Sequence, residues 1–175
     1  MKKRIIGVFG IVAVGFGSFL IYIIVKKYNQ NKAIALQKKI LPNFQFYNQD
    51  LELFSSKQLR EDVGVCIFYY NAECEHCQYE AAQINKEVIA FKNTQIVMIS
   101  TNTPKETADF ARTYKLDNAG FIWLYDKEYA FYKWFGKSVT PSVYIYNNAH
   151  KLVKEYIGEV KIEAIIKYLD NGKEG

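Results

Sequence analysis

A short hydrophobic strand that leads into two closely spaced cysteines constrains the fold of this chain more than any other feature. Residues 65–70 read VCIFYY, a β-branched and aromatic run that is typical of a buried central strand. Cys74 follows after three residues, and apolar residues then recur at intervals of three and four, namely Cys77, Ala81, Ile84, Val88 and Phe91. This spacing predicts a helix that begins in the cysteine pair and ends near Phe91.

The rest of the chain from Leu41 alternates between strand and helix patterns. Apolar residues on both sides of the turn-forming residues 48–50 predict a β-hairpin. Further strands are predicted at 95–99, 121–125, 142–146 and 152–157, and further helices at 103–115, 127–135 and 160–169. Strands that alternate with helices and then form a hairpin predict an α/β domain of three layers, with a mixed β-sheet flanked by helices.

The N-terminal segment contains 21 consecutive residues without a charge, from Ile5 to Val25. A helix of this length spans about 30 Å, the thickness of a bilayer's hydrocarbon core. The run is longer than the apolar part of a signal peptide, and no small-x-small site directly follows it, so we expect a single uncleaved transmembrane helix. Basic residues flank the run on both sides: Lys2, Lys3, Arg4, Lys26 and Lys27.

These patterns divide the chain into a membrane anchor at 1–27, a juxtamembrane linker at 28–40 and a folded domain at 41–172. We expect a single-pass protein of the cell membrane with its N-terminus in the cytoplasm and its domain on the periplasmic side, where closely spaced cysteines can form a disulfide. The net charge of +5 is modest, and the lysines are spread along the chain with many in the first forty residues, so the surplus is typical of charge that flanks a membrane segment and argues against nucleic-acid binding.

The cysteine pair is suited to thiol–disulfide exchange. Free N–H groups and the helix dipole stabilise a thiolate on Cys74, the predicted nucleophile, and Cys77 is placed one turn later to attack a mixed disulfide. A protonated His76 would stabilise the Cys74 thiolate and make the pair more oxidising. Three carboxylates act in the opposite direction, those of Glu73, Glu75 and Glu80. The motif therefore leaves the direction of electron flow open.

A metal site is the main alternative to redox chemistry at these cysteines. A tetrahedral zinc site needs four ligands, and only Cys66 and His150 remain as further candidates. Cys66 lies within the apolar strand, where we expect a buried and inert thiol. His150 lies in a turn and is expected to be solvated, so the sequence favours a redox pair over zinc.

With these residues in place, the chain resembles the thioredoxin superfamily, and within it the membrane-anchored TlpA/ResA-like branch of redoxin (AhpC/TSA-like) thiol–disulfide oxidoreductases. The resemblance covers Leu41 to Leu169. Residues 41–44 (LPNF) look like the opening segment of that branch, and residues 50–59 look like its hairpin. Residues 139–160 (VTPSVYIYNNAHKLVKEYIGEV) look like its cis-proline strand, its terminal hairpin and the glycine before its last helix.

The resemblance implies roles for several residues. Thr140 and Pro141 would form a cis peptide bond beside the cysteines and bind substrate through the backbone of Thr140. Cys74, Cys77, His76 and Glu75 would form the catalytic motif, with a redox-active Cys74–Cys77 disulfide and no separate cofactor or metal.

The resemblance also implies partners: disulfide-bearing or dithiol client proteins outside the cytoplasm and a membrane electron donor.

The chain departs from the family pattern at two positions that bear on the chemistry. Glu73 replaces the usual tryptophan, and Phe68 stands where many thioredoxins carry a buried acid, so the usual proton relay to Cys77 is expected to be missing.

Three functions fit these residues. A reductase of disulfides in exported proteins fits best, a DsbA-like oxidase or isomerase reverses the flow, and a copper-binding chaperone of the same fold would use the cysteines as soft ligands. By the same resemblance, the copper chaperones that share this fold space their cysteines by three residues rather than two, which counts against the last. We expect an aromatic cluster to form core packing: Trp123, Tyr125, Tyr129, Phe131, Tyr132, Trp134 and Phe135.

Overall fold

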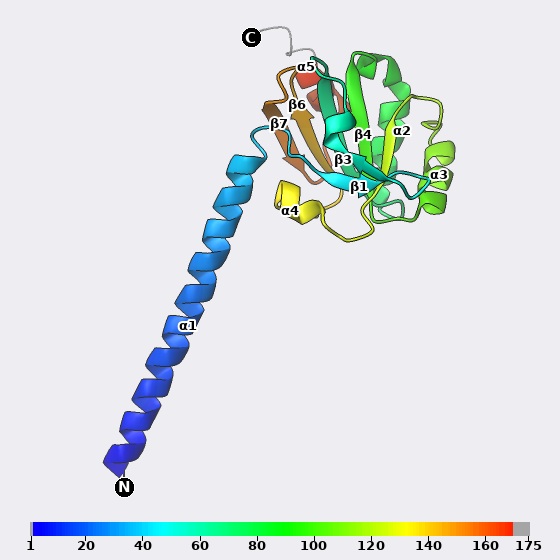
Figure 1. Cartoon of the computed structure of the whole chain (residues 1–175). Helices are drawn as coiled ribbons and strands as arrows, with labels where there is room; N and C mark the ends of the chain where they lie inside the picture. Colours follow the sequence, from blue (N-terminus) through cyan, green and yellow to red (C-terminus); the bar gives the residue numbers. More distant parts are fainter. Residues whose placement is uncertain (1, 170–175) are drawn as a thin grey trace.

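A seven-stranded sheet forms the centre of the domain in this computed structural model, which describes residues 2–169, with side chains described from residue 15 onward. The strands lie in the order β2-β1-β5-β4-β3-β6-β7 (Figure 1). Their bounds are β1 Gln45–Tyr47, β2 Leu53–Ser55, β3 Gly64–Tyr70, β4 Thr94–Ser100, β5 Ile122–Tyr125, β6 Ser142–Tyr146 and β7 Leu152–Ile157.

The sheet is mixed, as the sequence predicted. Strands β3, β4 and β5 run parallel to one another, whereas β1 pairs antiparallel with β5, and β6 and β7 continue antiparallel from β3. Residues 65–70 are buried throughout, in agreement with a central strand. The hairpin of β6 and β7 has the bounds expected from the sequence.

Helices cover both faces of the sheet. On one face, alternate residues of β3 such as Cys66 and Phe68 pack against α2 (Glu75–Lys86), α3 (Pro104–Thr113) and α5 (Ile162–Leu169). On the other face, Ile67 and its neighbours pack against α4 (Phe131–Phe135) and the segment that leads into β1. The expected three-layer thioredoxin-like arrangement is therefore confirmed.

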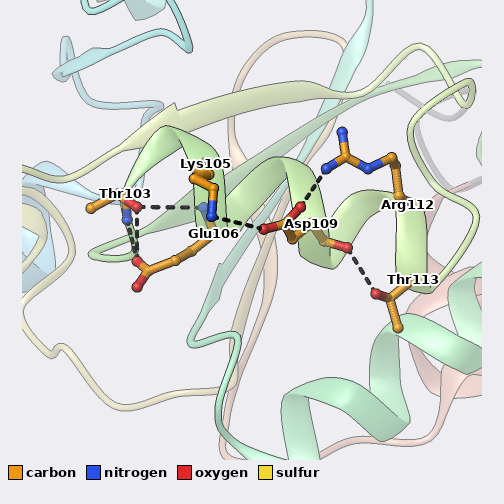
Figure 2. A network of polar contacts seen from close by, with 6 residues as sticks. All are labelled: Thr103, Lys105, Glu106, Asp109, Arg112 and Thr113. Carbon is orange, nitrogen blue, oxygen red and sulfur yellow. Dashed lines mark hydrogen bonds and ion pairs between the residues drawn. The ribbon is translucent and has the colours of Figure 1, made fainter.

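Helix α3 begins where the sequence placed it because its first turn is capped. Thr103 accepts a hydrogen bond from the backbone N–H of Glu106, and the Glu106 carboxylate accepts one from the N–H of Thr103 in return (Figure 2). Pro104 occupies the first helical position, where its missing N–H is not needed. Asp109 contacts both Lys105 and Arg112 on the exposed face (Figure 2).

Two helices are shorter than their apolar patterns suggested. Helix α2 ends at Lys86 because Glu87 leaves the helical conformation (φ −111°, ψ 21°), and residues 88–91 form a separate 3₁₀ turn. Helix α4 starts only at Phe131, where the buried carboxylate of Asp126 accepts hydrogen bonds from the N–H groups of Ala130 and Phe131. A side-chain anchor before the helix thus replaces its predicted first turn.

The expectation that the aromatic cluster forms core packing is only partly correct. Phe131 and Phe135 are fully buried, and Trp123 is 9% exposed. Tyr129 and Tyr132, however, are 68% and 51% exposed.

The N-terminal part forms one long helix, α1 (Lys2–Gln37), which extends away from the sheet (Figure 1). This helix runs through the predicted boundary between anchor and linker. The end of the predicted linker packs on the domain instead of staying free, because Lys39 O accepts a hydrogen bond from Leu152 N–H and Ile40 bridges to Lys151.

Among the residues that the structure describes, no helix is long and apolar enough to cross a membrane. Residues 1–14 of the predicted anchor lie outside those whose side chains are described, and residues 170–172 of the predicted domain lie outside the described residues. The transmembrane helix stays a prediction.

Candidate active site

The cysteine pair lies at the junction between β3 and α2. Cys74 is the N-cap residue of α2, with extended backbone angles, and its side chain is half-buried. Cys77 lies in the first turn of the same helix and is only 2% exposed. Both are free thiols. The N-terminal end of a helix favours negative charge, so the arrangement presents an accessible sulfur that can ionise and a shielded sulfur behind it.

Two polar side chains that were not predicted from the sequence hold the loop before Cys74. Asn71 accepts a hydrogen bond from the N–H of Glu73 at 2.8 Å, and its carbonyl accepts one from the N–H of Cys74 at 3.1 Å. Asn102, which follows β4, accepts from the N–H of Ala72 at 2.9 Å. Asn102 follows the end of β4, and β4 is the parallel neighbour of β3. Only the order of the strands in the sheet therefore brings Asn102 to this loop.

The surroundings of Cys77 favour its protonated form. Burial raises the pKa of the Cys77 thiol, and the nearby Cys74 and the charge of Glu80 raise it further. The backbone N–H of Asn71 approaches Cys77 Sγ at 3.4 Å and lowers the pKa, but it does not offset burial. Cys77 therefore needs a base before it can act as a nucleophile.

Glu80 is a buried carboxyl group one turn after Cys77, and it lies close enough for its charge to raise the pKa of the Cys77 thiol. It is 4% exposed, and its Oε1 accepts a hydrogen bond from the N–H of Val160 at 3.2 Å. Burial raises the pKa of Glu80 to about 7, and Glu159 adds to this effect through its negative charge. Phe68 occupies the strand position where the usual acid was expected to be missing, and Glu80 is a buried carboxyl group that lies near Cys77 on the helix instead.

A sequence signal for Glu80 was present. Helix α2 buries Cys77, Ala81 and Ile84 on its inner face, and Glu80 falls on the same stripe. A carboxylate at a core position of an amphipathic helix costs stability unless it is paired or protonated, so its presence there points to a chemical role.

His76 and Glu75 both lie on the exposed side of the first turn of α2. His76 Nδ1 contacts Glu159 Oε2, from the loop that joins β7 to α5. The sequence indicated only the carboxylates within and near the motif, and Glu159 was not predicted as the partner of His76.

Thr140 and Pro141 lie at the same end of the sheet as the cysteines. Their peptide bond is cis, as the resemblance implied. They directly precede β6, whose residue Ser142 pairs with Tyr69 near the end of β3, just before the cysteine loop. The Pro141 carbonyl accepts a hydrogen bond from the N–H of Gly158 at 2.8 Å. The role of these residues in substrate binding stays a prediction.

Cys66 is fully buried, as expected, and burial raises the pKa of its thiol well above the usual value. Across residues 2–169, no group of three or more potential ligands is arranged to hold a metal ion. His150 is half-buried in the turn before β7, rather than solvated as the sequence suggested.

Comparisons with known proteins agree with this geometry. The family model of the AhpC/TSA family matches residues 38–155. No curated protein matches the chain. A secreted Mycobacterium tuberculosis disulfide oxidoreductase, described as homologous to E. coli DsbE, is 14% identical; the match covers 74% of this chain and 96% of that one, with a TM-score of 0.62.

Two further solved structures have the same fold. StoA from Bacillus subtilis is 16% identical over 75% of this chain and 99% of its own, with a TM-score of 0.58. Peroxidoxin BcpB from Mycobacterium tuberculosis is 19% identical over 78% of this chain and 96% of its own, with a TM-score of 0.63. The family model spans more than half of the chain and the sheet has the fold of thiol–disulfide oxidoreductases, so the chain belongs to the AhpC/TSA family and is a thioredoxin-like protein.

Proposed function

We propose that this chain is a membrane-tethered thiol–disulfide oxidoreductase that reduces disulfides in client proteins outside the cytoplasm. The observation that carries the proposal is the pairing of a half-exposed Cys74 at the N-terminus of α2 with a buried Cys77 one turn behind it. The fold comparisons and the family match support the same chemistry.

The exchange reaction uses the two cysteines in turn. The Cys74 thiolate attacks one sulfur of a client disulfide, the client S–S bond breaks, and the other client cysteine leaves as a thiolate. Glu80 then takes the proton of Cys77, and the resulting thiolate attacks Cys74 Sγ. The second client thiol leaves, so the client gains two electrons and the chain holds a Cys74–Cys77 disulfide. We propose that a dithiol donor in the membrane returns the two electrons.

The charges around the motif support the reducing direction. A couple becomes more oxidising when its thiolate is stabilised, and His76 is the group within the motif that would do so. Glu73 and Glu75 flank Cys74, and the carboxylate of Glu159 contacts His76. These negative charges disfavour a thiolate, so we assign the chain to the reductases and not to the DsbA-like oxidases.

The reduction potential of the Cys74/Cys77 couple tests this proposal. We expect a value near that of thioredoxin, about −270 mV, and far from the strong oxidants near about −120 mV. The measurement equilibrates the full chain, in mild detergent, with glutathione buffers of known ratio, and Cys74→Ser serves as the control that cannot form the disulfide. A value near the oxidants would reverse the proposed direction, and the lack of any reversible couple would reject redox chemistry.

We further propose that residues 5–25 tether the domain to the cell membrane, with the N-terminus in the cytoplasm. The 21-residue uncharged run and the basic residues at both of its ends support this tether. The large apolar side chains from Phe16 to Val25 are exposed on α1, and burial in lipid would remove them from water.

Fractionation of cells that express the chain tests the tether. The full chain should stay in the membrane fraction after an alkaline carbonate wash, whereas a chain that begins at Tyr28 should be released. Protease added to spheroplasts should digest the domain, because it lies outside the cytoplasm. Release of the full chain by carbonate would reject the tether, and a protected domain would reject the orientation.

A further inference from the structure

The loop between β7 and α5 contacts three parts of the redox site with three successive residues. The N–H of Gly158 donates to the carbonyl of Pro141 at 2.8 Å, the carboxylate of Glu159 contacts His76, and the N–H of Val160 donates to Glu80 at 3.2 Å. Gly158 has a φ of +95°, a left-handed conformation that favours glycine, and it turns the chain toward the site. A loop near the C-terminal end of the chain therefore packs against the redox site.

The middle contact joins two side chains that remain accessible to solvent. The side chains of His76 and Glu159 are 68% and 41% exposed. A carboxylate oxygen only accepts hydrogen bonds, so Nδ1 of His76 carries the proton in this contact. The pairing directs the imidazole ring of His76, which lies two residues after Cys74 in the chain, toward Glu159. It also places a negative charge directly against the one residue within the motif that can carry a positive charge.

We propose that Glu159 is a positioning residue of the redox site, which holds His76 in place and offsets the positive charge that His76 would otherwise present to the Cys74 thiolate. This inference rests on the proposed redox function and adds a residue that lies 83 positions from the motif histidine. By offsetting His76, Glu159 keeps the motif from acting as a strong oxidant.

The neighbouring residues of the loop make Glu159 suited to this role. Its backbone is held on both sides, by the Gly158 contact to Pro141 and by the Val160 contact to Glu80. An exposed ion pair contributes little to stability when both side chains must be ordered to form it. Here the hydrogen bonds of the loop already fix the backbone of Glu159, so less ordering remains. Without His76, by contrast, the exposed Glu159 side chain would turn toward water, where its charge is screened.

The rate at which iodoacetamide alkylates the reduced full chain tests the proposal, because this reagent attacks the thiolate. Cys66 is fully buried and Cys77 is 2% exposed, so the reaction reports Cys74, and peptide mass analysis confirms the site. The measurement is made at pH 5.5, about a unit below the ordinary pKa of histidine.

Glu159→Gln should increase the alkylation rate by about threefold, because it removes the negative charge and leaves the imidazolium beside the thiolate. Glu159→Asp, which keeps the charge, should restore a rate within about twofold of the unmodified chain. In a His76→Gln background, Glu159→Gln should change the rate by less than about 1.5-fold. Glu163→Gln, an exposed glutamate in the first turn of α5, is the matched control and should leave the rate unchanged.

The proposal is overturned if Glu159→Gln leaves the rate of the unmodified background unchanged, or if it accelerates alkylation equally with and without His76. Either result would mean that Glu159 does not act through the histidine. Failure of the proposed redox function is distinguishable, because it would show as the lack of a reversible Cys74/Cys77 couple whatever the alkylation rates of these variants.

Discussion

A Glu80→Gln variant should reduce a disulfide substrate about a hundredfold more slowly than the unmodified chain at pH 7, the size of effect that a positioned acid–base group contributes. Cys77 must lose its proton before it can attack the mixed disulfide, and burial raises the pKa of its thiol. The Glu80 carboxyl, whose pKa burial raises to about 7, is ionised in part at neutral pH and can accept that proton. Glutamine keeps the shape and an oxygen for the Val160 N–H, but it cannot take a proton.

The pH dependence of the same reaction distinguishes a proton acceptor from a structural residue. In the unmodified chain, the rate of resolving the mixed disulfide should rise as the pH passes through about 7, where the buried Glu80 carboxyl becomes a carboxylate. In the glutamine variant this step should disappear, and the rate should rise only at more alkaline pH, as Cys77 itself ionises.

Stopped-flow measurement with a peptide disulfide separates the first attack by Cys74 from the resolving step. The exposed neighbours provide matched controls, since Glu73→Gln and Glu75→Gln remove the same charge close to Cys74 without removing the buried acid. Both controls should keep the step near pH 7. An unchanged resolving rate in Glu80→Gln would reject Glu80 as the base of Cys77.

The local parts of the redox site were predictable from the sequence because each rests on neighbouring residues. The β-branched strand, the two cysteines and the apolar spacing of α2 lie within one stretch of chain, and the structure confirms the strand, the helix start and the burial of Cys66. The final hairpin was equally predictable, because a turn-forming cluster separates two runs of alternating apolar residues.

The partners of the titratable groups were not predictable, because they come from the other end of the chain. Val160 and Glu159 lie 80 and 83 residues from the groups that they contact, Glu80 and His76. Only the order of the strands brings the β7–α5 loop over the start of α2. Glu80 was predicted only as one of several carboxylates near a thiol; its place on the apolar stripe of α2 indicated burial, but not its contact with Val160, whereas Glu73 and Glu75 are exposed.

Helix α4 shows a different limit of the sequence pattern. A run of aromatic residues predicted a helix from residue 127. The buried Asp126 carboxylate instead accepts hydrogen bonds from the N–H groups of Ala130 and Phe131, and the helix starts at Phe131. The run therefore divides into buried rings and exposed ones. The two hydrogen bonds to Asp126 that set the start of the helix cannot be read from composition or periodicity.

Truncation of Phe131 to alanine should destabilise the domain by about 3–5 kcal/mol, the range for removing a buried phenylalanine ring. The Phe131 side chain is fully buried, and its ring stacks on Tyr69 at 3.9 Å and on Phe135 at 4.4 Å between centroids. Phe46 and Tyr144 contact it from the same core at 6.3 and 5.9 Å. The ring joins α4 to three strands, so its loss leaves a cavity that no single neighbour can fill.

Urea unfolding of the reduced full chain in mild detergent, followed by tryptophan fluorescence, measures this loss. The matched control is Tyr132→Ala in the same helix, whose side chain is 51% exposed and whose removal should change the free energy of unfolding by less than about 0.5 kcal/mol. Phe131 packs on the face of the sheet opposite α2, so the potential of the folded variant should stay that of the unmodified chain. A loss below about 1 kcal/mol would mean that the core closes over the missing ring, and that α4 is held by Asp126 and not by its aromatic packing.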